Sequence, residues 1–381
     1  MMKRYRWRWT LTLLLGSTSA LAAQQVRGRI VTEADSTPVP HALLLLMDES
    51  GPERARSVTS ASGGFDLRAP TAGRFRLRVQ RIGQRGWEAP PIDLAVGTSL
   101  TLILQVPNTP FELPALEVVS RRSRCNVTLG DGSLGAAIME AAQTALGLAE
   151  AEAPTGRRTY AAESYRRTIP DHGPALDSTV TSLQLTGWPV ESADPDSLRI
   201  RGFVQGQWPA PNVMDGGPVV GPTYFAPDAR VMFSDWFLET HCIAVDTVSL
   251  GERGLEKAVV ARFQPVRGTR DVAALRGQLV FDRSTFGLRL LNFEFVARPR
   301  WAPHGSAGGD LRFARLPDGT WVPASWQLRV PLPKVGSDRY RFYGLLEVGG
   351  RVSSVRVDGR PDTAAQKAVA EALRYGAKPG A

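Results

Sequence analysis

The sequence predicts a mainly β protein, built from a small N-terminal β-sandwich, one linking helix and a larger antiparallel β domain. Three observations support this fold class. Short apolar stretches separated by turn residues fill positions 24–106, a helical apolar pattern follows at 133–153, and strand-like alternation returns over 154–358. A length of 381 residues with 43% hydrophobic and 22% charged residues fits two or three globular domains and excludes a disordered chain.

Residues 1–23 carry the three-part pattern of a cleaved secretory signal. Four basic residues within the first eight positions lead into the apolar stretch 11–15, and small residues follow up to Ala23. The apolar part is too short for a spanning helix, which needs about 20 residues. We therefore expect an exported protein of the periplasm, the outer membrane or the cell surface.

The net charge argues only weakly for a nucleic-acid partner. Removing the four cations of residues 1–23 lowers the formal charge from +9 to +5. Arginine supplies 41 of the 46 cations, a bias that genome base composition produces as readily as phosphate binding does. We expect no nucleic-acid partner.

Export also decides how the two cysteines are interpreted. Cys125 and Cys242 are the only ones in the chain, and two cysteines in an oxidising compartment most often pair. A disulfide closing a loop of ~100 residues is worth ~4.7 kcal/mol in the chain-entropy model. The alternative is two buried free thiols, and the role is structural in both cases.

Within 24–106, alternation and turn chemistry predict the strands. Three arginines, Arg74, Arg76 and Arg78, alternate with apolar residues, which places the apolar side chains inward and the arginines outward. The unbroken apolar run 43–47 suits a strand that is covered on both faces. Glycines at 63 and 64 allow a tight reversal before the next strand.

Five segments of this region form a recognisable pattern. They read GRIV at 28–31, PVPHA at 38–42, SASGGFDL at 60–67, GRFRLRV at 73–79 and IG at 82–83. With this pattern, residues 25–106 resemble the carboxypeptidase regulatory-like domain, as found in uncharacterised exported bacterial proteins. The resemblance implies a seven-stranded sandwich of transthyretin-like or starch-binding-like type. Two positions depart from the family pattern: Ser-Ala-Ser replaces the usual Thr-Asp before the turn, and Gln84 stands where an aromatic residue is common.

A linker and two helices are expected around the second domain. Residues 107–132 contain three prolines between 107 and 114 and form the linker. In the helix at 133–153, apolar residues share one half of the helical wheel, Ser133 can cap the start, and Pro154 ends it. The tail 359–381 contains a short helix.

Residues 154–358 predict one large antiparallel β domain. Segments 278–281, 288–296, 326–330 and 340–348 alternate or nearly alternate in polarity. The region is loosely similar to the half-barrel of lipoprotein-carrier proteins, which implies a curved sheet or half-barrel.

The motifs argue against catalytic and cofactor sites. Only four histidines exist, and none has the spacing of a zinc-peptidase motif. The sequence GDGSLG at 130–135 matches the dinucleotide fingerprint, but no βαβ unit follows it, so we interpret it as a glycine turn before a helix. The sequence DPDS at 194–197 is interpreted as a turn rather than as a calcium site. We expect no enzyme activity, no metal and no cofactor.

The arginine strand is the foremost ligand-binding candidate. Residues two apart on a strand share one face at a spacing of about 7 Å, so Arg74, Arg76 and Arg78 can contact phosphates, sulfates or uronates. The alternative is a solvated sheet face. Trp87 and Trp301 are candidates for stacking on sugar rings.

Export, β architecture and the missing catalytic motifs favour a non-catalytic envelope protein. Its sandwich would serve binding or spacing, with a carbohydrate or anionic surface ligand, and its larger domain would hold a ligand or partner. Partner classes are an envelope polysaccharide, a lipid or an outer-membrane protein. Two alternatives stay open, an outer-membrane β-barrel with a soluble N-terminal sandwich and a hydrolase of unfamiliar type. The sequence leaves the oligomeric state open.

Overall fold

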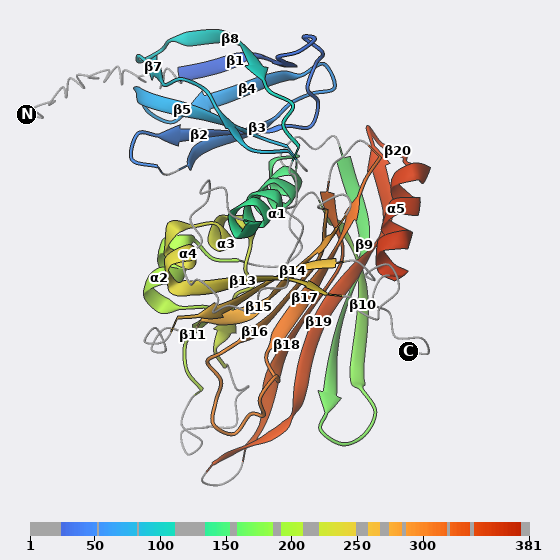
Figure 1. The fold of residues 1–381 in the computed structure, drawn as a ribbon. Coiled ribbons are helices and arrows are strands. Elements are labelled where there is room, and N and C mark those ends of the chain that lie inside the picture. Colours follow the sequence, from blue (N-terminus) through green and yellow to red (C-terminus); the bar gives the residue numbers. More distant parts are fainter. Residues whose placement is uncertain are drawn as a thin grey trace, which may run out of the picture.

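The fold was analysed in a computed structural model (Figure 1). The structure describes residues 24–51, 53–81, 84–110, 134–152, 158–185, 192–208, 221–248, 258–266, 274–283, 287–317, 321–335 and 339–374. The predicted signal 1–23, residues 130–133 of the glycine motif with the predicted helix cap Ser133, and Cys125 lie outside these residues. The expectation of a mainly β fold is confirmed, because most of the described residues belong to two small sheets and one large antiparallel sheet.

The N-terminal part is a sandwich of two sheets. One sheet has the order β4-β1-β8, and the other has the order β3-β2-β5-β6 with β7 also paired to β5. The strands are β1 (Gln24–Thr32), β2 (Leu43–Asp48), β3 (Glu53–Val58), β4 (Gly64–Ala69), β5 (Gly73–Gln80), β6 (Trp87–Glu88), β7 (Ile92–Leu94) and β8 (Ser99–Val106).

Eight strand segments occupy seven strand positions. Strand β6 pairs with one end of β5 and β7 with the other, so together they form a single interrupted edge strand. Pro90 and Pro91 stand at the interruption. Proline has no amide hydrogen to donate to a strand ladder, which explains the break.

Strand β2 is covered on both faces, as its unbroken apolar run predicts. Leu44 and Leu46 belong to the core between the two sandwich sheets. Leu43 and Leu45 point the other way and pack in the larger core that includes helix α1 (Leu134–Glu152). The sandwich is therefore joined to the rest of the molecule by an apolar contact and is not only tethered to it.

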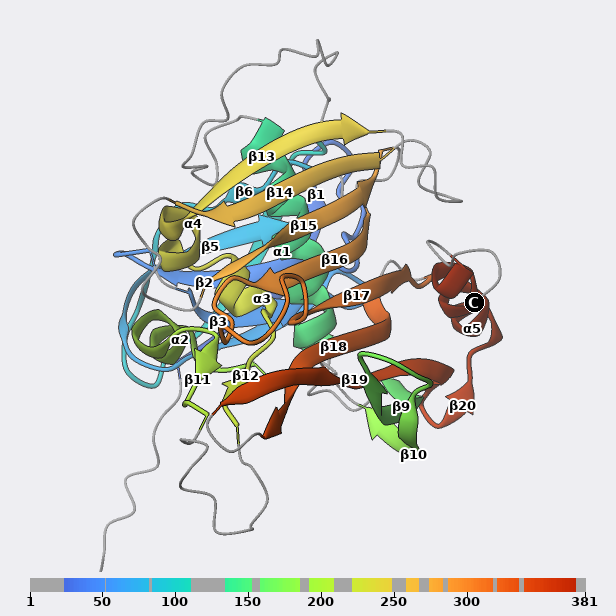
Figure 2. The ribbon, with the colours of Figure 1, turned by 90° about the horizontal axis from the view of Figure 1, so that it is seen from below.

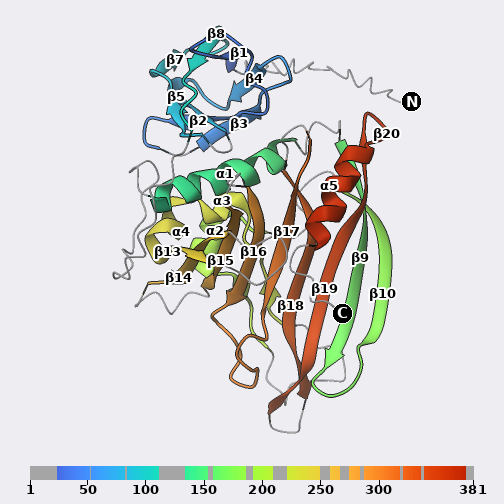
Figure 3. The ribbon, with the colours of Figure 1, turned by 45° about the vertical axis from the view of Figure 1, so that its right-hand side comes forward.

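Helix α1 lies between the sandwich and the large sheet (Figures 1 and 3). Its apolar side chains Ile138, Met139 and Leu146 are fully buried in the larger core. At Gly147 a Cβ atom would come within 2.6 Å of Cδ2 of Leu43, so the missing side chain allows the helix to approach β2 closely.

The large sheet has the strand order β10-β9-β19-β18-β17-β16-β15-β14-β13, with β20 paired to β19. Its neighbouring strands are all antiparallel. The strands are β9 (Arg158–Pro170), β10 (Leu176–Leu185), β13 (His241–Val248), β14 (Ala258–Pro265), β15 (Leu275–Asp282), β16 (Leu288–Phe295), β17 (Gly308–Arg315), β18 (Trp321–Val335), β19 (Tyr340–Val357) and β20 (Arg360–Pro361). Seven consecutive strands, β13 to β19, form a meander, and the β9–β10 hairpin joins it beside β19. Figure 2 shows the curvature of this sheet.

Short elements complete the second part of the chain. They are α2 (Pro195–Arg201), β11 (Val204–Gln205), β12 (Thr223–Tyr224), α3 (Ala229–Met232), α4 (Asp235–Thr240) and α5 (Thr363–Arg374). Helix α5 confirms the expected short C-terminal helix, and Val369 lies in the same core as α1. No described helix has the length and apolar character needed to cross a membrane.

One local prediction was wrong. The segment 194–197 was expected to be a turn, but a helix begins there, with Asp194 as the N-cap of α2. The Asp194 carboxylate accepts a hydrogen bond of 2.9 Å from the Asp196 backbone amide, which satisfies a helix-end donor. Within the described part of the chain no cluster of three or more potential metal ligands occurs.

Candidate functional site

The three arginines of β5 point away from the sandwich core, as the alternation predicts. The residues between them, Phe75, Leu77 and Val79, are buried in the core. The three guanidinium groups nevertheless have different surroundings along the strand, so each is described separately.

Arg78 is committed to the contact with α1. Its Nη2 donates to Oε1 of Glu140 at 3.0 Å, and the two side chains are only 20% and 10% exposed. Beside this pair, Gln80 donates from Nε2 to Oε1 of Gln143 at 2.8 Å. Thr144 donates its hydroxyl to the backbone carbonyl of Glu140 at 2.8 Å. Arg78 is therefore part of a buried polar interface between the two domains.

Arg76 and Arg74 lie at the open end of the same strand. Arg76 forms an ion pair of 3.0 Å with Glu88, and the two side chains are 38% and 43% exposed, so solvent screens the pair and it is worth little. Arg74 is exposed and makes no ion pair or hydrogen bond with any described residue. Strand β5 thus offers two arginines to a ligand, Arg74 and Arg76, and not three.

These two arginines line a pocket of about 280 Å³ on the sandwich. The other lining residues are Glu49, Phe75 and Pro91. Two guanidinium groups can bind an oxyanion through charge-assisted hydrogen bonds, and Pro91 supplies an apolar wall. Glu49 contributes one negative charge to the pocket, which opposes ligands of high negative charge and can accept a hydrogen bond from a hydroxyl group.

Trp87 does not join this pocket. It pairs with Val79 across β5 and β6, and residues that face each other in a ladder point to the same side of the sheet. Val79 is buried in the sandwich core, and Trp87 packs against that core. The structure therefore places Trp87 on the opposite side of the sheet from the arginines.

Trp301 lies in an aromatic cluster that the sequence did not reveal. Its ring centroid is 5.6 Å from that of Trp208 and 6.1 Å from that of Tyr340, and Trp208 and Tyr340 are 6.0 Å apart. The three rings come from distant parts of the chain, so no spacing pattern could have linked them. Since β19 begins at Tyr340, the cluster lies at the end of the large sheet remote from the sandwich (Figure 1).

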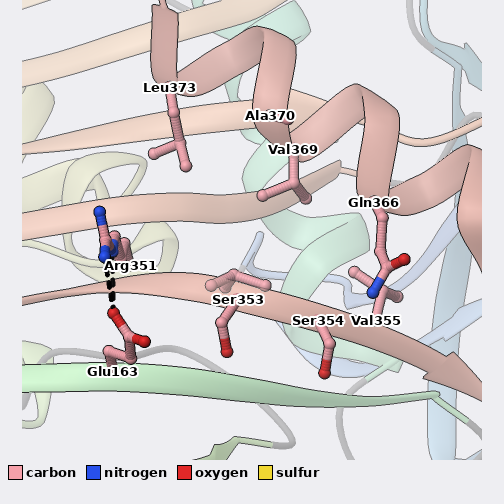
Figure 4. Close-up of a pocket in the computed structure, with 10 residues that line it drawn as sticks. Glu163, Arg351, Ser353, Ser354, Val355, Gln366, Val369, Ala370 and Leu373 are labelled. Atoms are coloured by element: carbon pink, nitrogen blue, oxygen red, sulfur yellow. Dashed lines mark hydrogen bonds and ion pairs between the residues drawn. The ribbon is translucent and has the colours of Figure 1, made fainter.

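A second pocket of about 290 Å³ lies between β19 and α5 (Figure 4). Arg351 and Glu163 form an ion pair of 2.8 Å on its border, with both side chains substantially exposed. Val355, Val369 and Leu373 supply apolar lining. Because its two charged residues neutralise each other, this pocket attracts a charged ligand less strongly than the arginine pocket does.

His241 is a buried neutral side chain. Its ring stacks on Phe237 with a centroid distance of 3.8 Å, and Nδ1 lies 3.0 Å from the Phe237 carbonyl oxygen. Burial lowers the pKa of His241 to about 4. Cys242 beside it is also buried, and its pairing with Cys125 stays a prediction because Cys125 lies outside the described residues.

A polar network crosses the large sheet at β9, β17, β18 and β19. Buried Glu347 pairs with Arg167 at 2.6 Å and accepts a hydrogen bond from Gln327. Burial raises the pKa of Asp310, and it raises the pKa of Tyr165 to about 12. The network satisfies a carboxylate that would otherwise be buried without a partner.

Comparison with known proteins identifies the first domain. Residues 25–107 match the family model of the carboxypeptidase regulatory-like domain, which confirms the resemblance inferred from the sequence. None of the curated proteins compared with the sequence matches it.

Solved structures with a loose likeness include three bacterial proteins. A proposed carbohydrate-binding protein from Bacteroides uniformis is 10% identical, with 71% of this chain and 95% of that chain covered and a TM-score of 0.20. A LolA superfamily protein from Nitrosomonas europaea is 14% identical, with 57% and 93% covered and a TM-score of 0.25. A proposed outer-membrane lipoprotein-sorting domain from Vibrio parahaemolyticus is 12% identical, with 57% and 93% covered and a TM-score of 0.24. Likenesses of this size carry no functional argument.

Proposed function

We propose that this chain is a non-catalytic exported protein of the cell envelope whose sandwich binds a singly charged acidic group of a polysaccharide. The observation that carries the proposal is the pocket of about 280 Å³ that Arg74 and Arg76 line. Arg74 has no described partner, and Arg76 is tied only to the exposed Glu88.

The lining of the pocket sets the class of ligand. An arginine guanidinium presents N–H groups in a planar fork that matches the two oxygens of a carboxylate or sulfate. Glu49 lies in the same lining and repels a second negative charge. A uronate carboxylate or a sulfate ester on a sugar therefore suits the pocket better than a phosphate dianion does.

The second domain is assigned the role of a support. Its helix α1 holds the sandwich through Leu43, Leu45 and the Arg78–Glu140 pair, so the pocket keeps one orientation relative to the large sheet. A binding module attached through a buried interface presents its ligand site more rigidly than a module on a flexible tether.

Binding without catalysis is the function that the pocket chemistry favours. General acid–base hydrolysis needs two groups of opposite role beside the scissile bond. Glu49 is the only carboxylate that lines the pocket among the described residues. We therefore assign recognition, and no reaction, to this site.

The test is a binding assay on the purified protein with polygalacturonate, a sulfated glycan and neutral dextran. We expect binding to the acidic glycans that weakens with salt, and none to dextran. A hydrogen bond to a charged group contributes about 1.5–3 kcal/mol of binding free energy. Arg74→Ala and Arg76→Ala should therefore each lower the affinity roughly tenfold or more. Equal affinity of the double variant and the unchanged protein would discard the site.

The matched control is Arg68→Ala. Arg68 is an exposed arginine on β4, in the other sheet of the sandwich, and its loss removes the same net charge. If Arg68→Ala weakens binding as much as Arg74→Ala does, the attraction is a property of the total charge and not of the pocket.

A further inference from the structure

Strand β10 forms one margin of the large sheet. It stands at the end of the strand order, pairs with β9 on one side, and has no described strand on the other side. In Figures 2 and 3 the β9–β10 hairpin lies at the side of the molecule, away from the sandwich. Among the described residues, its outer edge therefore presents backbone donors and acceptors that no strand pairs with.

This edge lacks the usual protection against pairing. Natural edge strands commonly carry proline, or charged residues such as lysine, that prevent association. From Ser178 to Leu185 the strand contains no charged residue and no proline, and its side chains are exposed as far as Gln184. Val180 is 65% exposed, and Leu176 and Leu183 are 42% and 37% exposed.

The sequence of the strand is symmetric about Val180. Residues 178–182 read Ser-Thr-Val-Thr-Ser, the same in both directions. When two copies pair antiparallel around a twofold axis at Val180, Val180 meets Val180 and Thr179 meets Thr181. Ser178, the counterpart of Ser182, lies in the register shift of the strand. This twofold axis is perpendicular to the sheet, so a side chain on one face of the first copy lies on the same face of the joined sheet in the second copy. The two residues of each pair therefore lie on the same face.

We propose that β10 pairs with β10 of a second copy of this chain, so that the two large sheets become one continuous sheet. The pairing places apolar against apolar and hydroxyl against hydroxyl, which are favourable cross-strand neighbours. The register shift between Leu176 and Thr179 includes Ser178, so the regular ladder starts at Thr179, the first residue of the Thr-Val-Thr centre of the segment.

The other edges of the structure fit this role less well. At the opposite margin of the large sheet, β13 begins with the buried side chains His241, Cys242 and Ile243. In the sandwich, β3 carries three charged residues, Glu53, Arg54 and Arg56. Strand β8 is uncharged and exposes 73% of Ile103, so it is the competing edge that the experiment has to separate from β10.

To test this proposal, the full chain is expressed and purified. The molar mass of the protein is then measured by light scattering over a range of concentrations. A contact made of two short strands lies at the small end of specific interfaces, so we expect the mass to rise from one copy towards two with concentration. Val180→Lys puts two ammonium groups on the axis and should keep the mass at one copy. Ile103→Lys adds the same charge to β8 and should leave the rise unchanged.

Cysteine substitution tests the register. Val180→Cys places two thiols opposite each other, within the reach of a disulfide, and should give a dimer band on a non-reducing gel. Ser182→Cys lies on the same strand and the same face, but its two copies are separated by four residues along the pairing, so it should give none. A mass of one copy at every concentration, loss of the dimer in Ile103→Lys instead of Val180→Lys, or equal cross-linking of both cysteine variants would each overturn the proposal.

Discussion

At the scale of single residues, the side chains that share a face do not share a role. Arg74, Arg76 and Arg78 were predicted together because alternation places them on one side of β5, and the structure confirms that side. Their partners differ because α1 covers only one end of the strand: Arg78 meets Glu140, Arg76 meets Glu88, and Arg74 meets solvent. A sequence pattern reports the direction of a side chain but not what another element brings to it.

The buried imidazole of His241 makes stability depend on pH. The pKa of His241 is lowered from 6.5 to about 4 in the folded protein, so the folded state binds a proton less readily than the unfolded state does. The stabilisation is complete above pH 6.5 and is lost as the pH falls towards 4, with a magnitude of ~3 kcal/mol. Urea unfolding at pH 7 and pH 4 should show this loss, and His241→Gln should reduce it.

The matched control for this prediction is His172→Gln, since His172 is exposed on the β9–β10 loop. Its replacement should leave the acid sensitivity of the protein unchanged. If His241→Gln and the unchanged protein lose the same stability between pH 7 and pH 4, other groups carry the acid response.

At the scale of secondary-structure elements, the sequence predicted long regular elements and missed short or proline-containing ones. The apolar half of α1 was predicted, but its polar half was not expected to be buried as well, against Gln80 and Arg78. Strand β18 was expected only at 326–330, where polarity alternates, but it continues on both sides through Pro323, Pro331 and Pro333, residues that are uncommon within strands. The structure accommodates Pro323 and Pro333 beside register shifts in the ladder. Helices α2, α3 and α4 have four to seven residues, too few for a helical period to be recognised.

The candidate site was predictable only in part for the same reason. Arg74 and Arg76 follow from alternation within one strand, whereas Glu49 and Pro91 come from neighbouring loops that the fold brings to them. The aromatic cluster around Trp301 likewise needed the positions of Trp208 and Tyr340. The residues of a site that is assembled from several loops lie far apart in the sequence, so they form no motif with a recognisable spacing.

The polar interface of α1 gives a prediction at the scale of this element. In a double-mutant cycle of Arg78→Ala and Glu140→Ala, measured by urea unfolding, we expect a coupling energy of about 2 kcal/mol, because the pair is largely buried. The control cycle, Arg76→Ala with Glu88→Ala, should give about 0–1 kcal/mol, because that pair is exposed. Equal coupling in the two cycles would show that the Arg78–Glu140 pair does not hold the sandwich to α1.

At the scale of the whole molecule, one continuous core joins the two domains. The larger core runs from Leu43 of the sandwich through α1 to Phe281 of the sheet and Val369 of α5. Pairing through β10 would join two copies of this chain and place two arginine pockets on one particle. Two linked sites bind a polymer of repeated acidic groups more tightly than one, because the second contact is intramolecular.

The predicted disulfide acts at this same scale, because it would tie residue 125, between the domains, to Cys242 at the margin of the large sheet. A bond that closes a loop of ~100 residues removes conformational freedom from the unfolded chain and is worth ~4.7 kcal/mol in the chain-entropy model. We expect the oxidised protein to be more stable than the Cys125→Ser, Cys242→Ala double variant by up to this amount in urea unfolding. Reducing agent should lower the stability of the unchanged protein only, since the double variant has no bond to break. Two free thiols per unfolded chain under non-reducing conditions would show instead that the cysteines are buried and unpaired, and the joining of the two domains would then depend on the contacts of α1.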